Sequence, residues 1–218
     1  KRHQFDLHWH LLSDSLYPSA DDDFWAAAVP VQVEDVATLT LCPTDHLFQT
    51  CAHGLKINPL TPLRWIADGR IILSAAGSAL DWDRFIEQAH RRRLSLVMCN
   101  ALTYLSETLD ASIPAEVLQR LAALPVSAAE RQEYRLRVTS SILGGYLPLA
   151  WSRYVRYQSQ NDPSVSLLYL WLGFPNYLRL VRRNKSVLQV GLWAVSKGIK
   201  RLWRSEERRV GKECRSRW

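Results

Sequence analysis

The sequence predicts an α+β fold that is mostly helical, with part of a small mixed β-sheet followed by a helical, bundle-like C-terminal part. Residues 4–12 alternate between apolar and polar side chains, as a half-buried strand does. Residues 29–41 alternate in the same way around Glu34 and Asp35, which predicts a hairpin. From Asp45 onward, apolar residues recur at helical spacing in successive segments. We therefore expect an edge strand and a hairpin from a sheet whose other strands lie outside this sequence.

The composition indicates a soluble protein of the cytoplasm. Apolar residues make up 47% of the 218 residues, enough for a packed core. The longest apolar run, residues 165–172, is too short to cross a bilayer, and no secretory signal opens the chain. Cys42, Cys51, Cys99 and Cys214 show no paired spacing, which favours free thiols in a reducing compartment.

The last fifteen residues, 204–218 (RSEERRVGKECRSRW), resemble an in-frame translation of a sequencing-adapter oligonucleotide. We expect a foreign tail that takes no part in the core. A genuine, solvated basic tail is the alternative. The tail holds six basic and three acidic residues, so without it the net charge falls from +7 to +4.

The acidic run Asp21, Asp22 and Asp23 precedes a short helix predicted from about Phe24. Carboxylates favour helix N-termini, so a capping role is expected in preference to a metal site. After the hairpin, Thr44 is the expected N-cap of the first long helix.

Five helices are predicted after the hairpin, with boundaries set by caps, glycines and prolines. They cover about Asp45–Lys56, Leu63–Ala75 with Gly77 at its end, Trp82–Arg93 capped by Asp81, Ser95–Leu109, and Pro114–Leu124. The polar residues 125–133 predict a subdomain boundary. Four further helices are expected near 134–143, 148–158, 165–172 and 187–203. The predicted domains are thus 1–42 (sheet), 43–124 (helical), 125–203 (helical extension) and 204–218 (tail).

The final predicted helix, 187–203, is basic and amphipathic. No acidic residue occurs between Asp162 and the tail, whereas seven basic ones do: Arg179, Arg182, Arg183, Lys185, Lys197, Lys200 and Arg201. Such a helix predicts weak peripheral contact with an anionic membrane, the alternative being a helix packed on the domain with a solvated basic face.

Four motifs in a fixed order carry a family resemblance. They are FDLHWHL (5–11), LFQTCAHGLK (47–56), LRWIADGRIIL (63–73) and LDWDRFIEQA (80–89). Together they resemble the later part of an uncharacterised bacterial nucleotidyltransferase-like family, which is similar to the DNA polymerase β-type nucleotidyltransferase superfamily. The resemblance covers about the first half of the chain.

The resemblance implies transfer of a nucleotidyl group from a nucleoside triphosphate to an acceptor hydroxyl, with magnesium ions held by three carboxylates. Asp6 matches the third carboxylate and is the expected catalytic and metal-binding residue. The family's Gly-Ser turn and Asp-x-Asp strand have no match here. Asp21-x-Asp23 and Asp81-x-Asp83 have the right spacing, but both stand at predicted helix starts. We therefore expect a C-terminal fragment of the enzyme that is inactive by itself.

Other polar side chains are secondary site candidates. His8 and His10 share the polar face of Asp6 and are expected to bind near the nucleotide, although a zinc site or a polar sheet face is also consistent with them. His53, Arg64 and Asp68 are weaker substrate-binding candidates. A structural hydrogen bond between His53 and Asp68 would be an alternative role for them.

The rival to the enzyme hypothesis is a helical binding module without catalysis. Its basic, Trp-rich C-terminal end would dock a protein partner or an anionic membrane surface. The sequence indicates no clear nucleic-acid site, because the run Arg91, Arg92 and Arg93 is explained by the C-terminal dipole of its predicted helix.

Overall fold

The computed structural model describes residues 10–12, 19–54, 62–138, 146–161, 164, 166–181, 186 and 188–189. The chain divides into two compact units, Lys1–Ser140 and Ser141–Trp218. Within the described residues the fold is mostly helical with one small antiparallel sheet, which confirms the predicted class.

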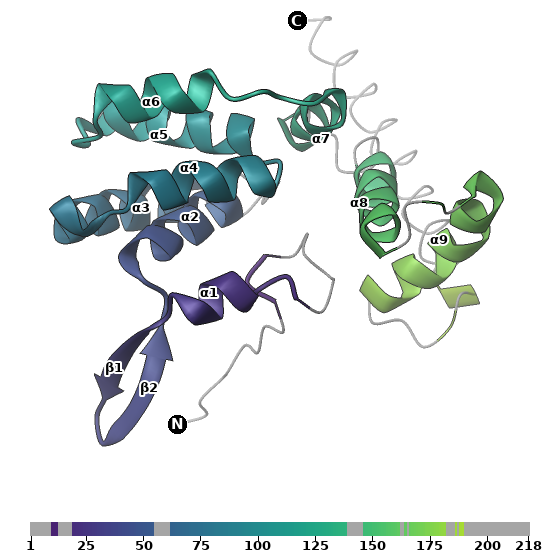
Figure 1. Cartoon of the computed structure of the whole chain (residues 1–218), viewed down its shortest axis with the longest axis horizontal. Coiled ribbons are helices and arrows are strands. Elements are labelled where there is room, and N and C mark those ends of the chain that lie inside the picture. Colours follow the sequence, from purple (N-terminus) through teal and green to yellow (C-terminus); the bar gives the residue numbers. More distant parts are fainter. Residues whose placement is uncertain are drawn as a thin grey trace, which may run out of the picture. The chain divides into compact units, whose positions relative to one another are not determined.

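The first unit contains one hairpin and seven α-helices among its described residues. Figure 1 labels them in chain order: α1 (Asp22–Ala26), β1 (Val29–Val33), β2 (Val36–Thr40), α2 (Pro43–Gly54), α3 (Pro62–Ala76), α4 (Trp82–Arg91), α5 (Ser95–Leu109), α6 (Ala115–Ala122) and α7 (Ala128–Val138). A single 3-10 turn, Gly77–Ala79, follows α3.

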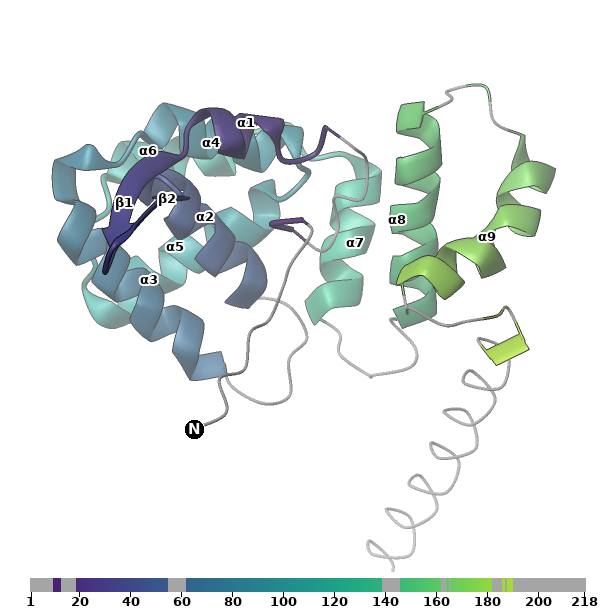
Figure 2. The same ribbon diagram turned by 90° about the horizontal axis from the view of Figure 1, so that it is seen from below.

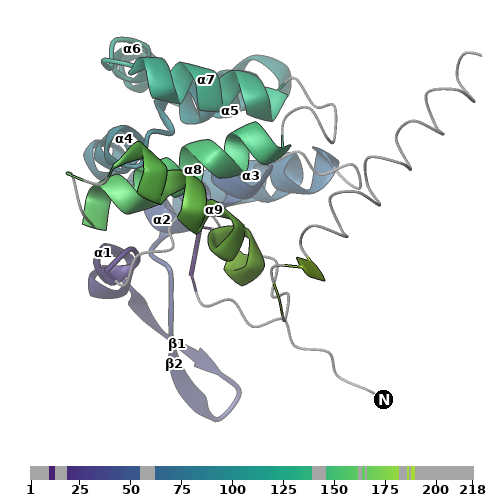
Figure 3. The same cartoon turned by 90° about the vertical axis from the view of Figure 1, so that its right-hand side faces the viewer.

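The hairpin has the predicted position and turn. Val29 pairs with Thr40 and Val33 pairs with Val36, and Glu34 in the turn adopts a positive φ of 51°. Both strands are exposed along their whole length. Figures 1 and 3 show why: the hairpin projects away from the helices of its unit. No third strand pairs with it in the described ranges.

The strand predicted over residues 4–12 is wrong at its described end. Residues 10–12 form a bend, and residues 4–9 lie outside the described part of the chain. The backbone N–H of Leu11 donates to Asp21 Oδ1 at 3.3 Å, so this donor serves a side chain and not a sheet ladder. Alternation alone cannot reveal such a competing acceptor.

The core of the first unit is built by α2 to α6 around three phenylalanine rings. Phe48 of α2 packs edge to face on Phe85 of α4, with ring centroids 5.5 Å apart, and Phe24 of α1 lies 6.4 Å from Phe48. The inward residues of α5, Met98 and Leu102, are fully buried. Figure 2 shows these helices gathered into one bundle beside α1. The apolar faces predicted for these helices therefore do face the core.

Most helix ends follow the predicted signals, but two predictions are wrong. Helix α2 begins at Pro43, so Thr44 lies in its first turn and is not the N-cap, and its Oγ1 accepts from the Asp81 N–H at 2.8 Å. The helix predicted near 134–143 is α7, which spans Ala128–Val138.

The α5 boundaries agree at both ends, and Asp81 caps α4 by accepting from the Arg84 N–H at 2.9 Å. Gly77 follows α3 with a φ of 49°, a conformation that glycine adopts without strain. Pro114 is the N-cap of α6.

The division between the two units falls after α7. Residues 125–133, whose polar composition predicted a subdomain boundary, include the first part of α7. Ser127 caps α7, because its Oγ accepts from the Glu130 N–H at 3.1 Å. The buried Glu130 carboxylate then accepts from the Leu96 N–H at the start of α5. Glu130 therefore connects α7 to α5 in the first unit. A glutamate in a polar segment is normally exposed, so the sequence did not predict this buried contact.

The second unit consists, in its described residues, of α8 (Tyr146–Asn161) and α9 (Leu167–Val181). An aromatic cluster joins them: Trp151 and Tyr154 of α8 contact Phe174 of α9 at centroid distances of 5.0 and 5.6 Å. The predicted helix over 165–172 in fact continues through Gly173 and Pro175, and Figure 2 shows that α9 bends. A proline inside a helix removes one backbone hydrogen bond and commonly bends it.

The predicted C-terminal helix, 187–203, and the tail, 204–218, lie outside the described residues, except for residues 188–189. None of the helices in the described ranges has the length and hydropathy needed to cross a membrane.

Candidate functional site

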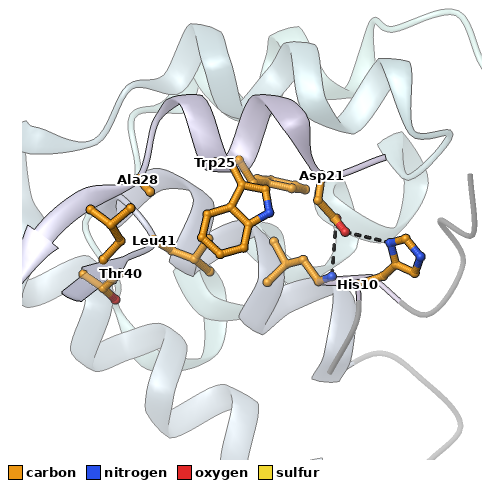
Figure 4. A pocket seen from close by; sticks show the side chains of 9 residues that line it. His10, Asp21, Trp25, Ala28, Thr40 and Leu41 are labelled. Atoms are coloured by element: carbon orange, nitrogen blue, oxygen red, sulfur yellow. Dashed lines mark hydrogen bonds and ion pairs between the residues drawn. The ribbon is translucent and has the colours of Figure 1, made fainter. Parts of the chain in front are cut away.

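A pocket of about 230 Å³ opens at the base of the hairpin. Its walls come from residues 10–12, from α1 and from the end of β2, three segments that are separate in the sequence (Figure 4). Leu11, Phe24 and Leu41 form the apolar floor, and His10 and Asp21 supply the polar end.

His10 and Asp21 are joined at that polar end. The His10 Nδ1–H donates to Asp21 Oδ2 at 2.8 Å, and the other carboxylate oxygen accepts from the Leu11 N–H. An ionised carboxylate can only accept, so Nδ1 carries the proton of this hydrogen bond, and in the neutral imidazole the lone pair is then on Nε2. A histidine oriented in this way can act as a base or bind a ligand through Nε2.

Asp21 therefore does not have the expected capping role. It occupies the N-cap position of α1, but its side chain makes no capping hydrogen bond. Its backbone carbonyl accepts from the Phe24 and Trp25 N–H groups, so the helix begins without help from the carboxylate. The acidic run marked the helix start correctly, while the partner of this carboxylate lies eleven residues earlier.

Trp25 forms the outer wall of the pocket. It is 69% exposed, although it belongs to the same short helix as the buried Phe24. An exposed indole beside an apolar floor is a surface on which a planar ring can stack. The pocket is smaller than the roughly 300–1,000 Å³ that drug-sized ligands fill, so it suits a single ring system.

A partly buried charge network joins α1 to the C-terminal end of α4 and so fixes the wall of the pocket. Arg92, which is 8% exposed, donates to Asp23 Oδ1 at 2.8 Å and to the Ala20 carbonyl at 3.0 Å. Its guanidinium also lies 4.2 Å from the centre of the Phe24 ring. Gln88 and Arg91 both donate to the second Asp23 oxygen. Burial raises the pKa of Asp23, but these partners outweigh it and leave that pKa below its usual value.

Asp23→Asn is expected to lower the free energy of unfolding at pH 7 by about 1.5–3 kcal/mol, because charge-assisted hydrogen bonds to two arginines are lost. The pKa of Asp23 is lower in the folded state, so its stabilisation is present above the usual value of 3.8 and is lost as the pH falls through the folded pKa. The difference between variant and wild type should therefore shrink below pH 3.8 in urea titrations at several pH values.

The matched control is Asp22→Asn, because Asp22 neighbours Asp23 on α1 but is exposed. It should change the free energy of unfolding by less than about 0.5 kcal/mol. A difference for Asp23→Asn that persists unchanged at low pH would contradict the role given to the carboxylate.

A second ion pair joins α2 to α4. Arg84 donates from Nε and Nη2 to both oxygens of Asp45, at 2.9 and 2.7 Å, and Asp45 is completely buried. Nη2 also donates to the Asp23 carbonyl at 2.9 Å. The hydrogen bond to Asp45 raises the pKa of Arg84 further above its usual value. Arg84 belongs to the motif at 80–89, and Asp45 lies two residues before the motif at 47–56. Part of the family resemblance therefore reflects residues that hold the helices together.

The two Asp-x-Asp pairs of the sequence have structural partners. Asp21 and Asp23 bind His10 and the arginines of α4, as described above. Asp81 caps α4, and Asp83 accepts from Arg120 of α6 at 2.6 Å. Their helix-start positions, expected from the sequence, are thus confirmed.

The predicted site residues are only partly brought together. Asp6 and His8 lie outside the described residues, and His10 lines the pocket. The His53 Nε2–H donates to the Leu11 carbonyl at 3.3 Å, which links the end of α2 to the pocket segment. Arg64 and Asp68 are exposed on α3 and do not line the pocket. Sequence reasoning missed Asp21 and Trp25 as pocket residues.

The described residues do not themselves fit a magnesium ion. They contain no group of three or more His, Cys, Asp or Glu side chains placed to hold a metal. Both Asp21 oxygens already accept hydrogen bonds, and His10 offers nitrogen where magnesium prefers oxygen. Cysteine chemistry is also disfavoured at Cys51, because burial raises the pKa of its thiol to about 12.

Residues 1–110 match a family model described as an uncharacterised nucleotidyltransferase. The matched range contains the four motifs, the hairpin, α1 to α5 and every residue of the pocket. No curated protein and no solved structure matches the chain.

Proposed function

The chain belongs to the uncharacterised nucleotidyltransferase family, and on that premise we propose that its enzyme transfers a nucleotidyl group from a nucleoside triphosphate to an acceptor hydroxyl. The acceptor oxygen attacks the α-phosphorus, the bond to the β-phosphate oxygen breaks, and pyrophosphate leaves. The hydroxyl proton passes to a nearby base. The observation that carries the proposal is the family match over residues 1–110.

Asp6 is the proposed catalytic carboxylate and a magnesium ligand, as its match to the third acid of the family implies. His8 and His10 follow it at intervals of two residues. We propose that they lie beside the nucleotide, with His10 held in one tautomer by Asp21. The pocket size and the exposed Trp25 ring support a nucleobase as the group that enters the pocket.

Transfer is proposed to need two further acids, which the Asp-x-Asp pairs of the described residues do not supply. Each of their acids already has a partner. Asp21 binds His10 and Asp23 binds Arg92, while Asp81 caps α4 and Asp83 binds Arg120. The chain by itself is therefore proposed to be inactive. Magnesium would neutralise phosphate charge in the intact enzyme, bound by Asp6 and those two acids.

The test compares Asp6→Asn with wild type in the natural polypeptide that contains both this sequence and an Asp-x-Asp strand. Transfer of the α-³²P label from each of ATP, GTP, CTP and UTP to a bacterial metabolite extract is measured with magnesium present. We expect Asp6→Asn to lower transfer by at least about a hundredfold, because one metal-binding charge is lost.

Asp22→Asn is the matched control, since Asp22 is an exposed acid whose loss should leave transfer unchanged. Circular dichroism should show the same helix content in all three proteins. Full transfer activity in Asp6→Asn would contradict the assignment of Asp6. Transfer by the 218-residue chain alone would contradict the proposed need for further acids.

A further inference from the structure

The N-terminal half of α9 carries an exposed apolar surface. Leu167, Leu168, Tyr169, Trp171 and Leu172 are between 61% and 74% exposed within the residues that the structure describes. We call these five residues the α9 surface. Ser166 precedes them and starts the helix, because its Oγ accepts from the Tyr169 N–H at 3.3 Å.

This surface is unusual because the inner side of α9 already has its partner. Leu170, Tyr177 and Leu178 are buried, and Phe174 packs edge to face on Trp151 of α8. A helix on the surface of a protein normally presents polar residues opposite its buried stripe. In α9 the only charged residue is Arg179, near the C-terminal end. We therefore expect the outer face of α9 to be buried against another apolar surface.

We propose that the α9 surface docks on an anionic lipid bilayer. Leucine side chains can enter the acyl boundary, while Tyr169 and Trp171 have the amphipathic rings that favour the headgroup level. The charge of the sequence around the surface is complementary to such a membrane. Residues 163–203 contain no acidic residue, and Arg179, Arg182 and Arg183 come after the surface in the sequence. Basic residues beside an apolar helix face are attracted to anionic lipid.

The proposed contact lies on the bilayer and does not cross it. The α9 helix has 15 residues, whereas a helix that spans the hydrocarbon core needs about 20. Its inner side is also held by the aromatic cluster with α8, where Phe174 lies 5.0 Å from Trp151 and Tyr177 lies 5.0 Å from Tyr154. Trp171, at the border of the α9 surface, also contacts Trp151 while staying 66% exposed. Only the outer face is free to be buried, as in an interfacial helix. The proposal is independent of nucleotidyl transfer and of the site in the first unit.

The test is flotation of the full chain with large unilamellar vesicles of phosphatidylcholine containing about 30% phosphatidylglycerol. The test variant is Leu168→Gln/Leu172→Gln, since both side chains are exposed and neither belongs to the aromatic cluster. The matched control is Val33→Gln/Val36→Gln, which removes two exposed apolar side chains from the hairpin, 56% and 64% exposed. The basic residues 204–218 are common to all three proteins, so they cannot cause a difference.

We expect wild type and the hairpin control to float, and the α9 variant to bind at least about tenfold more weakly with unchanged circular dichroism. Binding to pure phosphatidylcholine should be weaker than to the anionic vesicles. Failure of wild type to float, or equal flotation of the α9 variant, would overturn the proposal. So would a wild-type dimer in analytical ultracentrifugation that the α9 variant abolishes, because a second copy would then cover the surface.

Discussion

Arg84→Met should lower the free energy of unfolding by about 3–5 kcal/mol, the cost of leaving a buried carboxylate without its charged partner. Asp45 is completely buried and receives two hydrogen bonds from Arg84, at 2.9 and 2.7 Å. The same guanidinium donates to the Asp23 carbonyl, so its loss also removes one of the contacts that hold the first turn of α1. Urea unfolding followed by circular dichroism measures the effect.

The double variant Asp45→Leu/Arg84→Met is the informative control. It removes both charges and fills the site with apolar groups, so it should recover most of the stability lost in the single variant. If Arg84→Met cost less than about 1 kcal/mol, the pair would behave like a solvent-exposed one. That result would contradict a buried, bidentate ion pair between α2 and α4.

Phe48→Ala should lower the free energy of unfolding by about 3–5 kcal/mol, because it opens a cavity among three aromatic rings. The Phe48 side chain is completely buried and contacts Phe85 edge to face at a centroid distance of 5.5 Å. Phe24, on the other side, belongs to the helix that forms the pocket wall. Chemical denaturation reports the loss of stability.

Trp25→Ala provides the contrast for this prediction. Trp25 is larger than Phe48, but it is 69% exposed and lies outside the core. Its removal should change the free energy of unfolding by less than about 0.5 kcal/mol. Equal destabilisation by the two substitutions would contradict the placement of the core around Phe48.

Local signals in the sequence predicted the helices of the first unit well. Asp81 acts as the cap of α4, Gly77 ends α3 with a positive φ, and Ser95–Leu109 is found as expected. Each of these signals involves residues that are neighbours along one helix. The hairpin was predictable for the same reason, since its turn and its alternation are both local.

Long-range pairing explains what the sequence did not reveal. Asp21 read as a capping acid, yet it binds His10, and Asp45 read as a first-turn acid, yet it binds Arg84 of α4. The sequence shows that a carboxylate is present at each position, but its partner depends on which helices the fold brings together. Helix α1 buries only Phe24, and the neighbouring Trp25 is exposed. The pocket could not be predicted because its three walls come from separate segments.

The position of the transferred label tests the proposed function most directly. The proposal requires a longer natural polypeptide in which an Asp-x-Asp strand accompanies this sequence. That polypeptide is given ATP labelled at either the α- or the γ-phosphate, with magnesium and a bacterial metabolite extract. Nucleotidyl transfer predicts that only the α-label enters the acceptor and that pyrophosphate is released in equal amount. Entry of the γ-label into the acceptor would identify a phosphotransferase and would contradict the proposal.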